Sequence, residues 1–387
     1  MVYKLASDSW DERELNAIKS VIATGQYTLG NYVSKFEDEF SEFLGVKHSI
    51  MVNSGSSANL IMLHALSLTT EKNKNEIIVP AVSWSTTYFP VHQAGFKLKF
   101  VDINPATLNM DIRGLAQNIN ENTAAVLWVS LLGNCADLEE ARKLCDQHDV
   151  KLLEDNCESF GASSTLGLAG SIGSMGTHSF FFSHHLQTME GGMLSTNCDT
   201  LAANARSLRA HGWTRDTKSG DLSNLADTDF QKSYEFILPG FCVRPVEFMG
   251  AIGSVQLEKW PEMLQHRQNN AAYFQQHAAR FEHQFRIQET KGTVSSWFGF
   301  SVILNDQHDR DQITTILKEN NIEVRPIVAG NFTKQPVISK LNHINGDSTF
   351  PNSDRLHYQG FFIGNDSRCI KTEIDYFFKI IGAYFND

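Results

Sequence analysis

Short apolar runs alternate with amphipathic stretches over the first 200 residues, and this alternation constrains the fold more than any other feature. The runs are rich in Val, Ile, Leu and Phe without polar alternation, which is typical of strands covered on both faces. The chain is therefore predicted to be an α/β protein with a mainly parallel sheet and right-handed crossovers. The predicted strands are Ile50–Val52, Glu76–Val82, Lys97–Ile103, Ala124–Leu132, Lys151–Glu154 and Thr177–Phe182, and the predicted helices are Ser57–Leu68, Ser85–His92, Leu138–Gln147 and Thr200–His211.

The last third of the chain predicts a second, smaller α/β domain. A long helical region over Val246–Phe281, with Pro261 as its one interruption, leads into it. Because 387 residues exceed the usual size of one compact domain, we divide the chain into a large domain, 1–245, and a small domain, 246–387. The polar stretch Asp216–Lys232 is expected to be a mobile loop. The elements expected in the small domain are strand Trp297–Leu304, helix Asp309–Asn320, strand Ile322–Pro326 and helix Lys371–Tyr384.

Net charge, hydropathy and cysteine spacing exclude several classes of binding partner and site for this chain. The net charge of −11 argues against a nucleic-acid or anionic-membrane surface. No apolar run reaches the roughly 18 residues of a membrane span, and the start, Met1–Asp8, lacks the apolar core of a signal peptide. No two of the six cysteines lie within nine residues of each other, so zinc or redox CxxC pairs are excluded and no metal site is expected. A cytoplasmic protein with reduced thiols is predicted.

Three segments place polar or aromatic groups at the ends of predicted strands, where parallel sheets bind ligands. The segment Asn53–Asn59 (NSGSSAN) follows a strand and opens a helix, which suits either a phosphate site or an ordinary serine N-cap. Trp84 follows the next strand and suits either stacking on a flat ring or filling the core. Asp155 ends a third strand, as the partner of a ligand or as a loop cap.

The segment Ser179–Gly192 (SFFFSHHLQTMEGG) resembles the cofactor-lysine segment of the DegT/StrS-type sugar aminotransferases, which use pyridoxal 5'-phosphate (PLP). That family's lysine stands five residues after the serine and six before Glu-Gly-Gly, and His184 occupies this position here. No lysine occurs within residues 152–217. The likeness covers nearly the whole chain, from Gly30–Glu37 through Gly250–Leu257, and implies the aspartate aminotransferase-like fold, PLP fold type I.

The resemblance implies a cofactor site that is complete except for the lysine. Asp155 occupies the position of the carboxylate that keeps the ring nitrogen protonated, which makes the ring an electron sink. Glu158 stands where aminotransferases usually carry glutamine, and a carboxylate near the cofactor hydroxyl or the substrate adds acid–base capacity. The other implied cofactor ligands are the ring cover Trp84 and the phosphate-binding residues Gly55, Ser56, Ser57 and Ser179.

The histidine changes the reaction that the resemblance implies. A lysine binds PLP covalently, whereas an imidazole cannot do so stably but can move a proton near neutral pH. The motifs are most similar to a histidine-bearing 3-dehydratase branch of the family, which serves colitose and O-antigen biosynthesis. The implied reaction removes the C3 hydroxyl of a nucleotide-linked 4-keto-6-deoxy sugar, with GDP-4-keto-6-deoxymannose as the expected substrate. L-Glutamate is expected to convert PLP to pyridoxamine 5'-phosphate (PMP), His184 to act as the base, and ammonia to be released.

The same resemblance suggests substrate-binding residues and a dimer. His185 replaces the usual asparagine and is expected to be a neighbour or orienting group that contacts substrate. Arg215, Arg244 and Arg325 are candidates for gripping a phosphate or carboxylate, although solvated surface arginines are the plainer interpretation. The Gly240–Arg244 element reaches into the partner subunit's site in this family, which implies a homodimer with shared sites. The family's phosphate-binding asparagine in this element is Cys242 here.

Two other functions remain open from the sequence. An ordinary sugar aminotransferase needs the lysine that this chain lacks. A catalytically silent regulator that keeps the PLP fold is the second alternative, and the loss of the asparagine at Cys242 leaves it open. The iron–sulfur branch of the histidine-bearing enzymes is disfavoured, because it needs a cluster of closely spaced cysteines.

Overall fold

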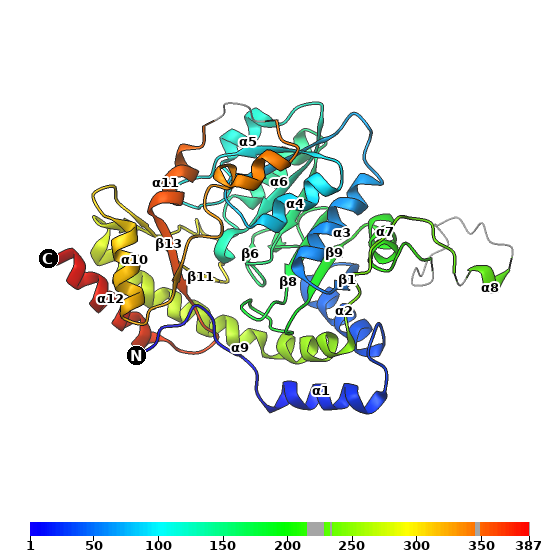
Figure 1. Ribbon diagram of the computed structural model, residues 1–387, viewed down its shortest axis with the longest axis horizontal. Helices are drawn as coiled ribbons and strands as arrows, with labels where there is room; N and C mark the ends of the chain where they lie inside the picture. The colour runs from blue at the N-terminus through cyan, green and yellow to red at the C-terminus, as the bar shows by residue number, and fades with distance from the viewer. Residues whose placement is uncertain (215–227, 233, 345–348, 387) are drawn as a thin grey trace.

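The computed structural model describes residues 1–214, 228–232, 234–344 and 349–386. Its larger part surrounds a seven-stranded sheet of order β1-β9-β8-β5-β4-β2-β3 (Figure 1). All neighbours from β8 to β3 pair in parallel, whereas β9 is antiparallel to both β1 and β8. The predicted mainly parallel sheet is confirmed. Its strands are β1 His48–Val52, β2 Glu76–Pro80, β3 Lys97–Val101, β4 Thr123–Val129, β5 Lys151–Asp155, β8 Met175–Ser179 and β9 Gly192–Thr196, and a separate hairpin pairs β6 Ser163–Ser164 with β7 Gly167–Leu168.

The strand β9 was not predicted from the sequence. It begins directly after the turn at Gly191, and its five residues are all buried. A Cβ on Gly192 would lie 2.3 Å from the backbone oxygen of Ser54, so only glycine allows this close approach. The added strand therefore brings the start of α3 (Gly55–Ser67) beside the end of β8.

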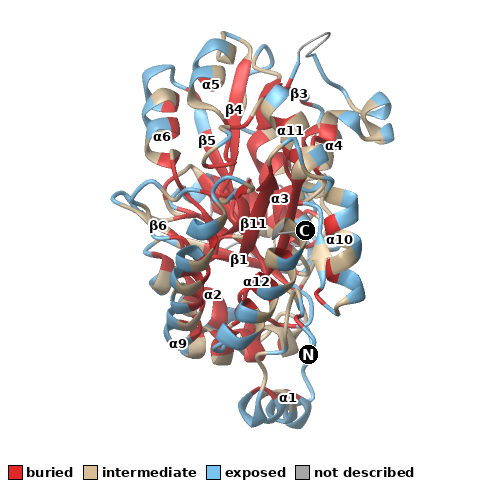
Figure 2. Cartoon of the chain, turned by 90° about the vertical axis from the view of Figure 1, so that its left-hand side faces the viewer, coloured by how far each residue is buried: buried red, intermediate tan, exposed pale blue. Residues whose placement is uncertain are grey.

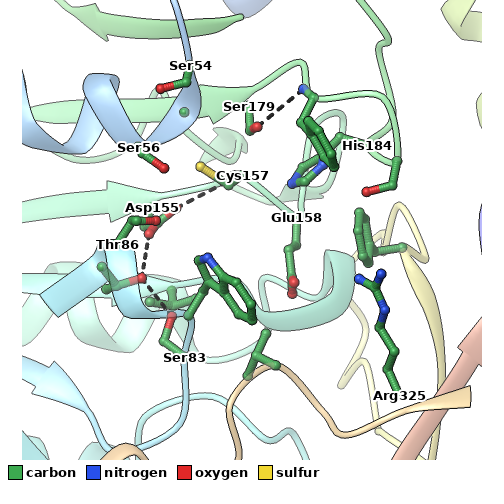
Figure 3. A pocket seen from close by; sticks show the side chains of 18 of the residues that line it. Ser54, Ser56, Ser83, Thr86, Asp155, Cys157, Glu158, Ser179, His184 and Arg325 are labelled. Atoms are coloured by element: carbon green, nitrogen blue, oxygen red, sulfur yellow. Dashed lines mark hydrogen bonds between the residues drawn. The ribbon is translucent and has the colours of Figure 1, made fainter. Parts of the chain in front are cut away.

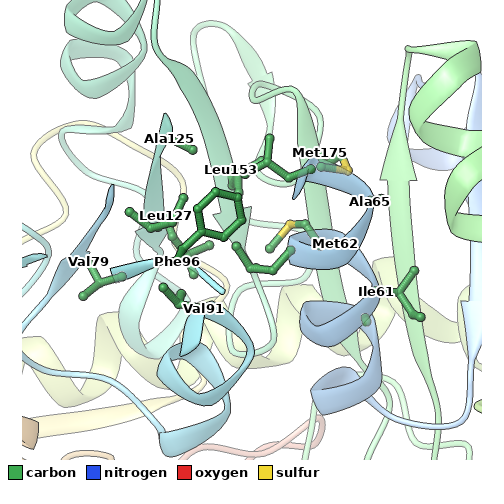
Figure 4. Close-up of a cluster of buried hydrophobic side chains, with 14 of the residues drawn as sticks. Ile61, Met62, Ala65, Val79, Val91, Phe96, Ala125, Leu127, Leu153 and Met175 are labelled. Carbon is green, nitrogen blue, oxygen red and sulfur yellow. The ribbon is translucent and has the colours of Figure 1, made fainter. Parts of the chain in front are cut away.

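Helices cover both faces of the sheet, as the alternation of elements predicts. Because successive side chains of a strand point to opposite faces, β2 places Ile77 and Val79 in one core and Ile78 in the other. The first core includes Met62, Leu127 and the other side chains shown in Figure 4. It is covered by α3, α4 (Ser85–Gln93) and α7 (Asp199–Arg209), and the second core by α5 (Ile112–Asn118) and α6 (Leu138–Gln147). Figure 2 shows the strands buried beneath these helices.

The C-terminal elements form a second, smaller sheet, which is antiparallel and has the order β10-β11-β13-β12. The predicted long helix is confirmed as α9 (Glu247–Ala278), which is followed by a 3-10 turn. The interruption expected at Pro261 is wrong, because the helix continues through this residue. The predicted strand at Trp297 begins two residues later, because Trp297 itself has a φ of +49°. The remaining elements are α10 Arg310–Glu319, α11 Pro351–Gln359, α12 Lys371–Asn386, β10 Phe285–Arg286, β11 Gly299–Leu304, β12 Val324–Arg325 and β13 Gly360–Gly364.

The N-terminal residues join the C-terminal core. Tyr3 is buried among the side chains of β11, β13 and α12, and its hydroxyl donates a 2.8 Å hydrogen bond to the backbone oxygen of Gly364. The helices α1 (Glu12–Thr24) and α2 (Asn31–Leu44) then pack on α9. The division of the chain at residue 245 stays a prediction.

Most of the loop predicted over Asp216–Lys232 lies outside the described residues, and its end forms the short helix α8 (Asp229–Lys232). Within the described ranges, none of the helices combines the length and the apolar character that crossing a membrane requires.

Candidate active site

A cavity lies at the carboxyl ends of the parallel strands, where open α/β sheets bind ligands. Side chains from the seven-stranded sheet and from the smaller antiparallel sheet line it, among them Val129 at the end of β4 and Phe362 of β13. In the described parts of the chain, no three His, Cys, Asp or Glu side chains gather as a metal site. Eight of the predicted site residues line this one cavity: Gly55, Ser56, Trp84, Asp155, Glu158, Ser179, His184 and Arg325. All of them except Gly55 and Trp84 are labelled in Figure 3.

One end of the cavity is the N-terminus of α3. Ser54 is the N-cap, and its Oγ accepts the Ser57 N–H at 3.1 Å, so the capping interpretation holds for Ser54. The hydroxyls of Ser56 and Ser179 line the cavity here. A Cβ on Gly55 would lie 2.5 Å from the Cβ of Ser179, so glycine alone lets the helix approach β8 this closely. The helix terminus and the two hydroxyls form a cradle suited to a phosphate group.

The N-cap role of Ser54 changes the interpretation of Ser57. Ser57 was predicted as a cofactor ligand, but it does not line the cavity. Its hydroxyl accepts a hydrogen bond from the Ser54 hydroxyl at 3.1 Å. The side chain of Ser57 therefore supports the turn behind the cradle.

Trp84 is the N-cap residue of α4 and borders the cavity. Its side chain is 57% exposed, so the core-filling interpretation left open by the sequence is excluded. An exposed indole at the mouth of a cavity is suited to cover a flat ring.

Asp155 ends β5, and its buried carboxylate is held by three donors. Oδ2 accepts hydrogen bonds from Asn59 Nδ2 and Thr87 Oγ1, each at 2.8 Å, and Oδ1 accepts the Cys157 N–H at 3.2 Å. Thr87 is in turn 2.7 Å from the hydroxyl of Ser83. The carboxylate is thereby fixed in orientation, as a partner for a ring N–H requires. Sequence reasoning missed Asn59 and Thr87, although both lie in the first turns of helices that start at this sheet edge.

Glu158 lies three residues beyond Asp155 and also lines the cavity. Its Oε2 accepts the N–H of Leu132 at 3.1 Å. Burial, reinforced by the charge of Asp155, raises the pKa of Glu158 to about 7, despite the opposing effect of the Leu132 hydrogen bond. Glu158 can therefore bind and release a proton near neutral pH.

His184 lines the cavity as the resemblance predicts (Figure 3). Its ring lies edge-on to the rings of Phe181 and Phe298, with centroid distances of 5.9 and 5.3 Å. Its Nδ1 is buried without a hydrogen-bond partner among the described residues. Burial, together with the charge of Arg267, lowers the pKa of His184 to about 4. The imidazole is therefore neutral at pH 7 and can accept a proton, although it is a weaker base than the unperturbed histidine assumed from the sequence.

The predicted substrate-binding residues are not all brought together. His185 does not line the cavity: its ring is buried, and its Nε2 donates to the backbone oxygen of Ser296 at 3.2 Å. Arg325 is exposed and borders the cavity. Arg244 lies outside it, with its guanidinium 6.0 Å from the centre of the Trp213 ring. Arg215 lies outside the described residues.

These groups fit the parts of PLP. The cradle suits the phosphate, Trp84 suits the ring and Asp155 suits the ring nitrogen, while the position expected to bind the aldehyde carries an imidazole. The fold and the site together define a protein of the PLP-dependent aminotransferase type that lacks the covalent anchor. The expectation of this fold is confirmed by the comparisons below.

The chain belongs to the DegT/DnrJ/EryC1/StrS aminotransferase family, whose profile matches residues 8–381. It is similar to the GDP-4-keto-6-deoxy-D-mannose 3-dehydratase of Escherichia coli O55:H7, with 42% identity over 98% of this chain and 99% of that protein. It is equally similar to the enzyme of the same name from Yersinia pseudotuberculosis, with 42% identity over 98% of each chain. A crystal structure of GDP-4-keto-6-deoxymannose-3-dehydratase with a trapped PLP-glutamate geminal diamine matches with a TM-score of 0.93, 42% identity and coverage of 98% of this chain and 99% of that one.

Proposed function

We propose that the chain is a PLP/PMP-dependent dehydratase that removes the C3 hydroxyl of GDP-4-keto-6-deoxy-D-mannose, with L-glutamate as the amino donor. The observation that carries the proposal is His184, a neutral imidazole in the cavity at the position of the family's lysine. The 42% identity to two dehydratases of this name supports the substrate, and the structure with PLP and glutamate supports the cofactor and the donor.

The proposed reaction is balanced without any further reactant. Glutamate loses two electrons and its amino group and becomes 2-oxoglutarate. The sugar gains these electrons at C3, where the carbon–oxygen bond breaks and a carbon–hydrogen bond forms. The overall products are one 2-oxoglutarate, one ammonia and one 3-deoxy-4-keto sugar, which fits a step in the biosynthesis of deoxysugars for lipopolysaccharide.

Different residues of the chain are proposed to bind different parts of the cofactor. When bound, the cofactor supplies an amine and a ring that stores an electron pair. Asp155 holds the proton on the ring nitrogen, since its carboxylate is fixed by Asn59, Thr87 and Cys157. Ser56, Ser179 and the start of α3 bind the phosphate.

Two side chains are proposed to handle protons. His184 accepts a proton as a base, because its imidazole is neutral and leaves the cofactor free. Glu158, whose pKa lies near 7, serves as a second proton carrier. Arg325, exposed at the edge of the cavity, is placed to pair with a phosphate of the nucleotide.

We infer that the active form is a homodimer with shared sites. The short helix α8 stands away from the rest of the chain in Figure 1; it carries the exposed ring of Phe230, and the exposed rings of Tyr234 and Phe236 follow it. Such rings are typical of interfaces. In this arrangement Arg244 serves the partner's cavity. We further propose a cytoplasmic location, since all six cysteines are free thiols.

Product analysis tests the proposed function. The protein is incubated with PLP, L-glutamate and GDP-4-keto-6-deoxy-D-mannose, and the sugar product is identified by mass spectrometry. We expect a keto sugar that has lost one oxygen atom, and no such product from His184→Asn. An amino sugar would instead make the chain an aminotransferase, and an unchanged substrate in the presence of bound PLP would favour the silent regulator.

A further inference from the structure

The segment Ser295–Phe298, which precedes β11, runs beside the cavity and is bonded to the 3-10 turn Leu131–Gly133 after β4. The N–H of Ser296 donates to the backbone oxygen of Gly133 at 2.9 Å, and the N–H of Phe298 donates to that of Leu132 at 3.0 Å. A Cβ on Gly133 would lie 2.6 Å from the backbone nitrogen of Trp297, so glycine is needed for this contact. The segment is therefore fixed against the large sheet.

The same turn holds Glu158. Leu132 has a φ of +53°, a left-handed conformation that is unfavourable for a residue with a Cβ. In this conformation its N–H points to Glu158 Oε2, at 3.1 Å, while its oxygen accepts from Phe298. One strained residue thus links the Glu158 carboxylate directly to the backbone of Phe298.

The other side of the segment meets the two histidines. His185 Nε2 donates to the oxygen of Ser296 at 3.2 Å, and Arg267 Nη1 donates to the oxygen of Trp297 at 3.2 Å. The ring of Phe298 lines the cavity and lies edge-on to both imidazoles, at 5.3 Å from His184 and 5.5 Å from His185. Of the two aromatic rings that pack against His184 among the described residues, Phe181 follows β8 and Phe298 directly precedes β11.

We propose that Phe298 is a positioning residue that sets the imidazole of His184 and shields it from water, and that its backbone couples this imidazole to Glu158 through Leu132. The inference rests on the proposed role of His184 as the base. In this arrangement the segment Ser295–Phe298 helps to position both proposed proton carriers, His184 and Glu158.

The protonation of His184 depends on several neighbours. His184 interacts electrostatically with Arg267 of α9 and with the adjacent His185, and Arg267 in turn interacts with Asp366. The charged groups that share the cavity with His184 are Asp155, Glu158, Glu190 and Arg325. Replacing Phe298 changes none of these charges, so a change in the titration of His184 reports its exposure and placement.

The first test uses the ligand-free protein and needs no sugar. The rate at which diethyl pyrocarbonate modifies His184 is followed by peptide mass spectrometry from pH 7 to pH 5, since only the neutral imidazole reacts. In the wild type the rate is expected to stay nearly constant, because the pKa of His184 is about 4. In Phe298→Leu water reaches the ring, the pKa rises toward its ordinary value, and the rate should fall about tenfold over this range. Phe298→Tyr, which keeps the ring, should behave as the wild type.

The second test measures dehydration. We expect Phe298→Leu to lower kcat by about 10- to 100-fold with little change in KM, because a displaced base slows the reaction without weakening binding. Val294→Ala, at an exposed position of the same stretch, is the control and should match the wild type in both tests. An unchanged modification profile in Phe298→Leu, or an equal effect of Val294→Ala, would overturn the inference. A wrong substrate would remove activity from every variant but leave the modification result intact.

Discussion

Acid should destabilise this protein through His178, a buried histidine of β8 outside the cavity. Its ring packs edge-on against Phe40 and Phe160, at 5.2 and 5.7 Å, and is fully buried. Neither ring nitrogen has a hydrogen-bond partner of normal geometry among the described residues, and the backbone of Ala169 offsets only part of the cost of burial. Burial lowers the pKa of His178 to about 3.

The sign and size of the effect follow from proton linkage. The unfolded state binds a proton at His178 below its ordinary pKa of about 6.5, whereas the folded state does not bind it until the pH approaches 3. The contribution to stability is therefore complete above pH 6.5 and is lost progressively as the pH falls. At pH 5 the loss is about 1.5 pH units times 1.36 kcal/mol, or about 2 kcal/mol.

Urea unfolding of the ligand-free protein at pH 7 and pH 5 measures this loss. The variant His178→Leu cannot titrate, so its free energy of unfolding should change by about 2 kcal/mol less than that of the wild type between the two pH values. The contribution of His184 is common to both proteins and cancels. That of His185 nearly cancels, because burial is the main cause of its lowered pKa and the charge of His178 is the smallest of the causes given. An equal loss of stability in the two proteins would refute the reasoning.

Three further predictions concern the site. PLP should be lost from the wild type on prolonged dialysis but retained by His184→Lys, and full occupancy of the dialysed wild type, read from cofactor absorbance, would contradict the absence of a covalent anchor. Gly55→Ala should weaken PLP binding and lower stability by about 1–3 kcal/mol, since its Cβ would lie 2.5 Å from that of Ser179, and an unchanged Kd would argue against the phosphate cradle. Glu158→Gln should remove the change in kcat near pH 7 that the wild type shows as this carboxyl loses its proton, and a profile that keeps this change would assign it to another group.

The sequence predicted the sheet edge and most of its functional side chains for a physical reason. Buried parallel strands appear as continuous apolar runs, and the residues that follow them lie at one edge of the sheet. Asp155 and Trp84 were found in this way, whereas the resemblance supplied Ser179 and the expected roles of all three residues. The short strand β9 was missed because five residues after a Gly-Gly turn carry too little pattern to separate strand from loop.

Contacts between segments that lie far apart in the chain could not be predicted from the sequence. Thr87 meets Asp155, and Phe298 meets His184, only because the folded chain brings different elements together. The direction of His185, away from the cavity, is likewise set by the oxygen of Ser296. The lowered pKa of His184 depends on burial and on Arg267 of α9, neither of which a local motif encodes.

We propose that the imidazole at position 184 makes this aminotransferase fold catalyse dehydration instead of amine transfer. The ammonia released for each molecule of GDP-4-keto-6-deoxy-D-mannose consumed, with glutamate as donor, tests it most directly. We predict one ammonia and one 3-deoxy sugar for each substrate with the wild type, and neither with His184→Asn. Consumption of the sugar with its nitrogen retained as an amino sugar, and no ammonia, would contradict the claim.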